Sequence, residues 1–286
     1  MDFGLIALVV AIVVGSAVLV TGIVCLRWSW VKQTVDTLGE RLVDVAPYVG
    51  FVAGALFIKQ AAHGTSVQIS KALDWDITAL IYQLEGTFVA EVQAITPAEL
   101  VPVFSAVYIF GFGYLVVTPV VYYLIGPSRR ALKELLVAYG LNASLGLVLY
   151  TLFIARGPRL YLGDAVDGLL FQLYPPVRNL TGAVSVTTNV FPSLHTSLSV
   201  IVLLVAWRTR ETQPRWFQIA AVVASGVVLS TMVLGIHWLV DVLAGVCLAV
   251  GCVYGAGHVV AAIEARRRFS SFGPESTRHD GTDSEG

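Results

Sequence analysis

Two histidines stand at the edges of apolar stretches, one in NVFPSLHTS (189–197) and one in GIHWLVD (235–241). In the second stretch, His237 and Asp241 are four residues apart, a spacing that places both side chains on one face of a helix. The carboxylate can then accept a hydrogen bond from one ring nitrogen and leave the other nitrogen basic, as a nucleophile or general base requires. A pair that only joins two helices is the structural alternative. A zinc site would need a third ligand, which the neighbouring sequence lacks.

The first stretch predicts a helix start. Ser193 directly precedes an apolar run, where a serine side chain commonly caps the first helical turn. His195 then lies in that turn, beside free backbone N–H groups and the positive end of the helix dipole, which together bind anions. A lone histidine near a helix start usually has a structural role, but the His/Asp pair that follows favours a chemical one.

Two arginines, Arg156 and Arg159, flank a Gly-Pro turn in ARGPRLY. Guanidinium groups bind phosphate oxygens in bidentate geometry, so both could converge on one phosphate. Anchoring to lipid headgroups is the alternative role. The sequence has no glycine-rich nucleotide loop and no acidic cluster suited to Mg²⁺. These residues together favour metal-independent phosphoryl transfer through a phosphohistidine, with no cofactor.

The segments that carry these residues are strongly hydrophobic. Of the 286 residues, 56% are hydrophobic and 13% are charged, whereas soluble domains have about 25% charged residues. A membrane-spanning helix needs about 20 mostly apolar residues. Uncharged apolar runs occupy residues 3–26, 100–128, 135–155, 194–207, 216–240 and 242–263, and a shorter one occupies 45–58. The sequence therefore predicts an all-α, polytopic transmembrane bundle of six to seven spans. The net charge of −1 gives no indication of nucleic-acid binding.

The basic residues predict the orientation. Clusters of Arg and Lys follow alternate spans, at Arg27 and Lys32, at Arg129, Arg130 and Lys133, at Arg208, Arg210 and Arg215, and at Arg266, Arg267 and Arg268. The positive-inside rule places all four clusters in the cytoplasm. This parity requires 45–62 to cross as well, with Lys59 reaching the outer interface. We therefore expect a multi-pass plasma-membrane protein with its N-terminus outside, its C-terminus cytoplasmic and both histidines at the extracytoplasmic face.

We expect three regions along the chain. Residues 1–99 hold N-terminal spans and an outer segment, residues 100–262 form the membrane core, and residues 263–286 end in a polar tail that composition predicts to be disordered. The outer segment contains apolar residues at helical spacing, which are Ile77, Leu80, Ile81, Leu84 and Phe88. This spacing predicts an amphipathic helix on the outer leaflet. A lid that only packs on the bundle is the alternative.

The two histidine motifs resemble the signatures of a known enzyme family. PSLH, followed further along by STMVLGIHWLVD, is similar to the second and third signatures of the type 2 phosphatidic acid phosphatase superfamily, usually Pro-Ser-Gly-His and Ser-Arg-x5-His-x3-Asp. With Leu194 in place of glycine, it looks more like the inositol phosphorylceramide synthase branch, whose members are inositolphosphotransferases. The resemblance covers roughly 100–262. Thr231 stands where the third signature has arginine, and the first signature, Lys-x6-Arg-Pro, is absent.

The resemblance implies a lipid phosphatase or lipid phosphotransferase. His237 would attack phosphorus with Asp241 orienting it, and His195 would protonate the leaving lipid alcohol and then deprotonate the acceptor. The implied phosphate ligands are Ser193, Ser230, Arg156 and Arg159, with Arg178 supplying the charge missing at Thr231. The partners would be a lipid phosphate substrate and membrane lipids, without nucleic acid. The sequence specifies neither the lipid, nor the acceptor, nor the oligomeric state.

Two other functions use the same residues differently. In a proton-coupled transporter, intramembrane His and Asp side chains would form a proton relay. The ionisable residues, however, gather at one interface, and the sequence has no paired broken helices. In a non-catalytic membrane scaffold, His237 and Asp241 would only hold helices together.

Overall fold

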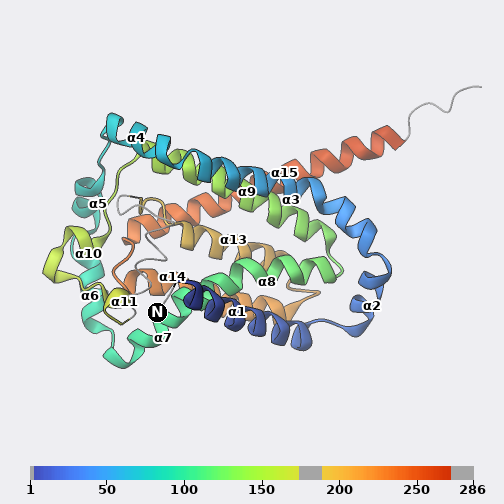
Figure 1. Ribbon diagram of the computed structural model, residues 1–286, viewed down its shortest axis with the longest axis horizontal. Helices are drawn as coiled ribbons and strands as arrows, with labels where there is room; N and C mark the ends of the chain where they lie inside the picture. Colours follow the sequence, from blue (N-terminus) through green and yellow to red (C-terminus); the bar gives the residue numbers. More distant parts are fainter. Residues whose placement is uncertain (1–2, 174–188, 272–286) are drawn as a thin grey trace, which may run out of the picture.

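The computed structural model describes residues 3–173 and 189–271, which form a bundle of long helices (Figure 1). Six stretches are long and apolar enough to cross a membrane by length and composition, and a seventh helix is apolar but shorter. The long helices are α1 (Phe3–Cys25), α3 (Leu38–Ala61), α8 (Phe112–Ile125), α9 (Arg129–Leu152), α13 (Leu194–Arg208), α14 (Pro214–Val233) and α15 (Leu239–Ser271). Within the described ranges, β-structure is limited to two isolated bridges. The predicted all-α membrane bundle is confirmed.

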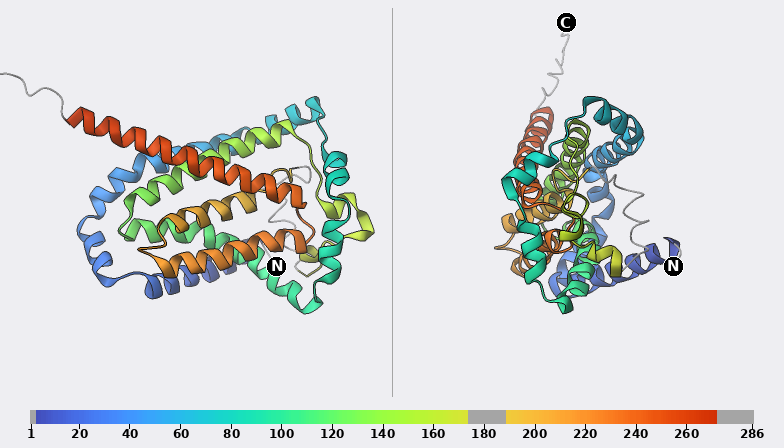
Figure 2. Two further views of the ribbon diagram at one scale, coloured as in Figure 1. Left: turned by 180° about the vertical axis from the view of Figure 1, so that it is seen from behind. Right: turned by 90° about the vertical axis from the view of Figure 1, so that its left-hand side faces the viewer.

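The long helices run between two ends of the bundle, and shorter helices close each end (Figure 1). One end carries α2 (Trp28–Asp36). The other end carries α4 (His63–Leu73), α5 (Thr78–Glu85), α6 (Phe88–Ile95), α10 (Pro158–Tyr161), η3 (Gly163–Ala165) and α11 (Leu169–Leu173). Both α13 and α15 begin at this second end, which Figure 2 shows from two further directions. Both motif histidines therefore lie at the same end of the molecule.

The helix that leads into the core is not uniform. After η1 (Ala98–Leu100) and α7 (Val101–Ala106), the chain forms a π-helical turn, η2 (Val107–Gly111), before α8 begins. Insertions of this kind are common at functional sites because they redirect side chains. The turn contains Tyr108, which faces the candidate site described below.

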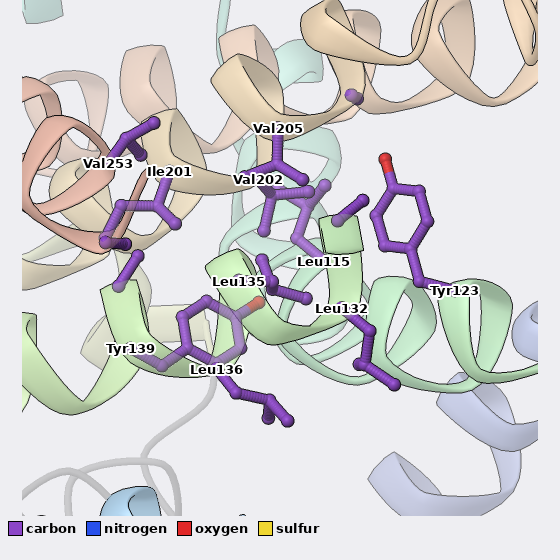
Figure 3. Close-up of a cluster of buried hydrophobic side chains, with 14 of the residues drawn as sticks. Leu115, Tyr123, Leu132, Leu135, Leu136, Tyr139, Ile201, Val202, Val205 and Val253 are labelled. Carbon is purple, nitrogen blue, oxygen red and sulfur yellow. The ribbon is translucent and has the colours of Figure 1, made fainter. Parts of the chain in front are cut away.

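The core lies where α13 packs against α9, α14 and α15. Buried aliphatic and aromatic side chains fill it, among them Leu115, Leu135, Ile201 and Val205 (Figure 3). Membrane helices gain no hydrophobic driving force from one another in lipid, so close packing at small residues matters more than in soluble bundles. Gly146 of α9 illustrates this, because a Cβ added there would lie 2.9 Å from a methyl carbon of Leu194.

Ion pairs join the helices at the end that carries α2. Lys133 Nζ lies 2.7 Å from Asp44 Oδ2, and Arg208 Nη1 lies 2.7 Å from Glu134 Oε2. Asp44 also accepts a hydrogen bond of 2.9 Å from Arg267. The basic clusters of the sequence therefore lie at the opposite end of the bundle from the histidines.

The outer segment differs from the single amphipathic helix predicted. It forms α4, α5 and α6, and α5 ends because Gly86 adopts φ +63°, a left-handed conformation that breaks the helix. Ile81 packs on the bundle and is 2% exposed, whereas Leu84 is 70% exposed. At the other terminus, α15 continues to Ser271, past the predicted end of the core at 262, and the tail from 272 lies outside the described residues.

Candidate active site

His237 lies in a tight turn between α14 and α15, two residues before α15 begins. The backbone N–H groups of Ile236 and His237 both donate to the carbonyl of Thr231, at 2.9 and 3.1 Å. Gly235 makes the turn possible at φ +65°, and a Cβ there would lie 2.6 Å from a methyl carbon of Val166. The side chain of His237 is 4% exposed. The turn therefore holds the ring in a fixed, buried position.

Asp241 reaches back to His237 from the first turn of α15. Its Oδ2 accepts a hydrogen bond of 2.9 Å from the backbone N–H of Trp238 and lies 3.4 Å from Nδ1 of His237. The second carboxylate oxygen has no hydrogen-bond partner among residues 3–173 and 189–271. The predicted juxtaposition is present, although His237 precedes the helix rather than sharing it. Because Nδ1 faces Asp241, Nε2 is the nitrogen available for chemistry.

The surroundings of His237 favour its neutral form. Burial lowers the pKa of His237 to about 4; a backbone hydrogen bond with Val190 acts against this shift, and the positive charge of Arg159 adds to it. A neutral imidazole has the free lone pair that a nucleophile needs. The ring is therefore neutral at neutral pH.

His195 lies beside His237, as the two motifs predict. Their ring centroids are 6.2 Å apart. The hydroxyl of Ser193 accepts a hydrogen bond from Thr196 N at 3.3 Å, so the predicted N-cap of α13 is confirmed. The His195 ring packs against Tyr108 and Phe112, with centroid distances of 4.7 and 4.3 Å. Aromatic stacking fixes the orientation of His195 relative to His237.

The two rings are close enough to act on one bound group. Their centroids are 6.2 Å apart, so a nucleophile on one ring and a proton donor on the other can both reach atoms of the same phosphate ester.

Gly245 of α15 allows the two histidine-bearing segments to approach. A Cβ at this position would lie 2.6 Å from the carbonyl oxygen of Ser193 and 3.1 Å from Cβ of Thr196. The backbone N–H of Ser193 also donates to the carbonyl of Asp241, at 3.0 Å. The start of α13 is thereby held against the first turns of α15.

The Gly245→Ala variant is therefore expected to be less active and less stable. The added methyl group would push α13 away from α15, and overpacking of this kind costs about 1–3 kcal/mol of unfolding free energy. A displacement of about 1 Å between His195 and His237 lowers turnover by about 100-fold. Thermal unfolding and kcat in detergent micelles test both effects.

Gly251→Ala is the matched control for Gly245→Ala. Gly251 lies on the same helix and has nothing within 4 Å of an added Cβ. Its replacement should leave kcat unchanged and raise stability slightly, since alanine favours helix. Equal losses of kcat and stability in the two variants would contradict the inference that Gly245 allows α13 and α15 to approach closely.

The structure separates the two predicted arginines. Arg159 lies near the histidines, since its charge acts on both His237 and Tyr108, and its backbone N–H donates to the carbonyl of Gly235 at 3.3 Å. The Arg156 side chain is 56% exposed and lies 3.7 Å from Asp76 Oδ2. The backbone carbonyl of Arg156 accepts a hydrogen bond of 2.8 Å from the indole of Trp238. Arg159 is thus the arginine placed to meet a phosphate, whereas Arg156 braces the His237 turn through its main chain.

The hydroxyl groups predicted to bind phosphate form hydrogen bonds with the backbone of their own helices. Ser230 Oγ donates to the carbonyl of Val227 at 2.6 Å, and Thr231 Oγ1 donates to that of Val228 at 2.7 Å. Ser193 is likewise fully buried, with its hydroxyl capping α13. These side chains shape the site in the conformation described. Arg178 lies outside the described residues.

Three contributors were missed by sequence reasoning. Tyr108 stacks on His195, and the Tyr150 hydroxyl donates to the carbonyl of Pro192 at 3.1 Å. Glu85 of α5 accepts a hydrogen bond of 3.0 Å from the backbone N–H of Val240, at the start of α15. A tyrosine in an apolar run resembles any interfacial aromatic residue, and a glutamate at the end of a short helix carries no local signal.

The comparisons with known proteins agree with this geometry. A family model described as the PAP2 superfamily matches residues 78–255, which include both histidines and Arg159. The chain is also 26% identical over 176 residues to the uncharacterized protein MJ0662 of Methanocaldococcus jannaschii, covering 60% of this chain and 68% of that protein. No solved structure matches. Since the family model covers more than half of the chain, the protein belongs to the PAP2 superfamily, whose members are phosphatases or phosphotransferases.

Proposed function

We propose that this protein is an integral membrane lipid phosphatase or lipid phosphotransferase that works through a phosphohistidine without a metal ion. The observation that carries the proposal is the pair of a buried His237 and a half-buried His195, with ring centroids 6.2 Å apart and Asp241 Oδ2 3.4 Å from His237 Nδ1. Two imidazoles and a carboxylate can supply a nucleophile, an orienting group and a proton donor.

In the first half-reaction, Nε2 of His237 attacks the phosphorus atom of a lipid phosphate. The bond between phosphorus and the lipid alcohol oxygen breaks, and the proton of His195 moves to that oxygen. Asp241 accepts the hydrogen bond from Nδ1 and stabilises the positive charge on the His237 ring. Arg159 balances charge on the non-bridging oxygens.

In the second half-reaction, His195 acts as the base. It takes a proton from the acceptor hydroxyl as the acceptor oxygen attacks phosphorus, and the bond between phosphorus and Nε2 breaks. Water as acceptor gives inorganic phosphate, whereas a polyol gives a phosphorylated polyol. The resemblance of PSLH to the inositol phosphorylceramide synthase branch favours an acceptor other than water and an inositolphosphotransferase activity.

The active site faces the extracytoplasmic side in this proposal. The basic clusters and their ion pairs lie at the end of the bundle opposite the histidines. The positive-inside rule assigns that end, together with the C-terminus, to the cytoplasm of a plasma-membrane protein. A cysteine introduced at Arg156, which is exposed at the histidine end, should then react with a membrane-impermeant maleimide from outside intact cells. Reaction only from the cytoplasmic side would show that the protein has the opposite orientation in the membrane.

A product assay tests the function. Purified protein in mixed micelles would receive a panel of lipids labelled in the phosphate, with and without EDTA and with and without inositol or glycerol. EDTA-resistant release of inorganic phosphate would identify a phosphatase, and label in a phosphorylated polyol only when the polyol is present would identify a transferase. Loss of activity in EDTA would contradict the metal-independent mechanism. Folded protein with no product from any lipid would favour the scaffold or transporter.

The pH dependence of kcat/KM is expected to reflect the shifted pKa of His237. Only the neutral ring attacks, and burial disfavours its protonated form, so the nucleophile stays active at lower pH than an ordinary histidine does. With the pKa of His237 near 4, lowering the pH from 7 to 5 should reduce the neutral fraction of His237 by less than about 2-fold, whereas it would reduce that of an ordinary histidine by about 30-fold. Protonation of His195, the proton donor, increases over the same range and therefore adds no acid limb. The profile is corrected for titration of the substrate phosphate. An acid limb near the usual histidine pKa would contradict this expectation.

A further inference from the structure

A lysine in the N-terminal part of the chain faces the bundle rather than lipid. The inward face of α3 carries four buried residues, which are Arg41, Val45, Tyr48 and Ala55. They recur at intervals of three, four or seven residues, as one helical stripe does. Lys59 follows Ala55 by four residues and extends this stripe. Beyond it, Ser66 of α4 is buried and hydrogen-bonds Thr151 of α9 at 2.7 Å.

The packing of α3 on α9 places Lys59 at the level of the histidines. Asp44 pairs with Lys133 at 2.7 Å, and a Cβ on Gly140 would clash with the ring of Phe51. In both pairs the residue of α9 follows the residue of α3 by the same number of positions. The same separation places Lys59 beside Val148 of α9, two residues past Gly146. Gly146 in turn lies against Leu194, the residue before His195. The Lys59 ammonium is close enough to interact electrostatically with His195.

Lys59 has no counter-charge among residues 3–173 and 189–271. It is half-buried, and it makes no hydrogen bond or ion pair within the described part of the chain. Lys133, the other lysine on an inward face, is paired with Asp44 at 2.7 Å. A cation in a membrane-spanning segment is costly, and such residues generally pair with a charge or bind a ligand. An unpaired ammonium within electrostatic reach of His195 therefore points to an anion that binds there.

We propose that Lys59 is a ligand of the substrate phosphate and that α3, which precedes the family-matched residues 78–255, completes the active site. The ammonium would donate hydrogen bonds to a non-bridging phosphate oxygen beside His195 and neutralise part of its charge. It would join Arg159, whose charge acts on His237, as a second positive charge at the site. This inference rests on the proposed phosphoryl-transfer function.

Binding of a non-hydrolysable lipid phosphonate tests the role of Lys59 without turnover. The ligand would be titrated in detergent micelles and its dissociation constant obtained from thermal shifts. Lys59→Gln should weaken binding by about 10- to 100-fold, as loss of a charged hydrogen bond does, whereas Lys59→Arg should retain most of the affinity. Lys71→Gln, at an exposed lysine of α4, is the control and should bind as wild type does.

The stability of the unliganded protein distinguishes a ligand from a structural lysine. If Lys59 serves to bind phosphate and not to stabilise the fold, Lys59→Met should unfold at the same or a higher temperature than wild type, because an unpaired charge has been removed. A lower unfolding temperature, or unchanged phosphonate affinity in Lys59→Gln, would overturn the assignment. Failure of wild type to bind phosphonate would overturn it as well. Lys59-dependent binding without turnover of any labelled lipid would refute the proposed function and leave the phosphate site standing.

Discussion

Replacement of His237 by glutamine is expected to reduce turnover by at least about 10,000-fold, as loss of a covalent nucleophile does in other enzymes. Glutamine approximates the size of the ring and can still hydrogen-bond, but its amide cannot form the bond to phosphorus. The measurement is twofold: initial rates on the labelled lipid, and label retained on the protein after acid-free quenching. Wild type should carry an acid-labile, base-stable phosphoryl group, and the variant should carry none.

His258→Gln is the control for this substitution. His258 is an exposed histidine further along α15, in edge-to-face contact with Tyr254 at a ring-centroid distance of 4.4 Å. Its replacement should leave turnover and labelling unchanged. A scaffold role for His237 would give a different pattern, in which His237→Gln mainly lowers the unfolding temperature. Persistent labelling in the His237 variant would place the nucleophile elsewhere.

Replacement of His195 by glutamine is expected to lower turnover of a lipid alkyl phosphate by about 100- to 10,000-fold, the usual contribution of a general acid and base. An alkoxide is a poor leaving group, so the first half-reaction depends on the proton from His195. An aryl phosphate has a much better leaving group and does not need that proton. The rate of the first half-reaction should therefore be largely restored with an aryl phosphate. Transfer of the phosphoryl group from His237 to the acceptor, which needs His195 as base, should then limit turnover.

The diagnostic measurement for His195 is the phosphoenzyme level with the aryl substrate. A burst of phenol followed by slow turnover, with label accumulating on His237, supports the assigned role in both half-reactions. Because His195 stacks on Tyr108 and Phe112, the unfolding temperature of the variant should be measured alongside. Equal losses with alkyl and aryl substrates would contradict a proton-donor role.

Local sequence was sufficient to predict the elements that fold by local rules. Long apolar runs without charge can satisfy their backbone groups in a membrane only as helices, so the all-α bundle followed from composition and length. The N-cap at Ser193 followed for the same reason, because a hydroxyl before an apolar run meets the unsatisfied N–H groups of the first turn. The four-residue spacing of His237 and Asp241 also predicted their contact, although a turn rather than a helix produces it.

Contacts between distant segments could not be read in this way. Arg156 and Arg159 are three residues apart and equivalent by sequence, yet one extends toward Asp76 of the outer segment and the other lies by His237. The outer segment shows a similar limit. Its apolar spacing predicts one amphipathic helix, but Gly86 divides it, and packing against Trp238 decides which residues are buried.

The sequence by itself determined that the chain is a helical membrane protein, and it singled out His195, His237 and Asp241 as candidates for its chemistry, since ionisable residues are costly in apolar runs. Only the tertiary structure decided what surrounds them: Tyr108 on a π-helical turn stacks on His195, and Glu85 of α5 accepts a hydrogen bond from the start of α15. Helical periodicity fixes which residues share a face. It does not fix which partner that face meets, because helix packing depends on shape and close contact across the whole bundle.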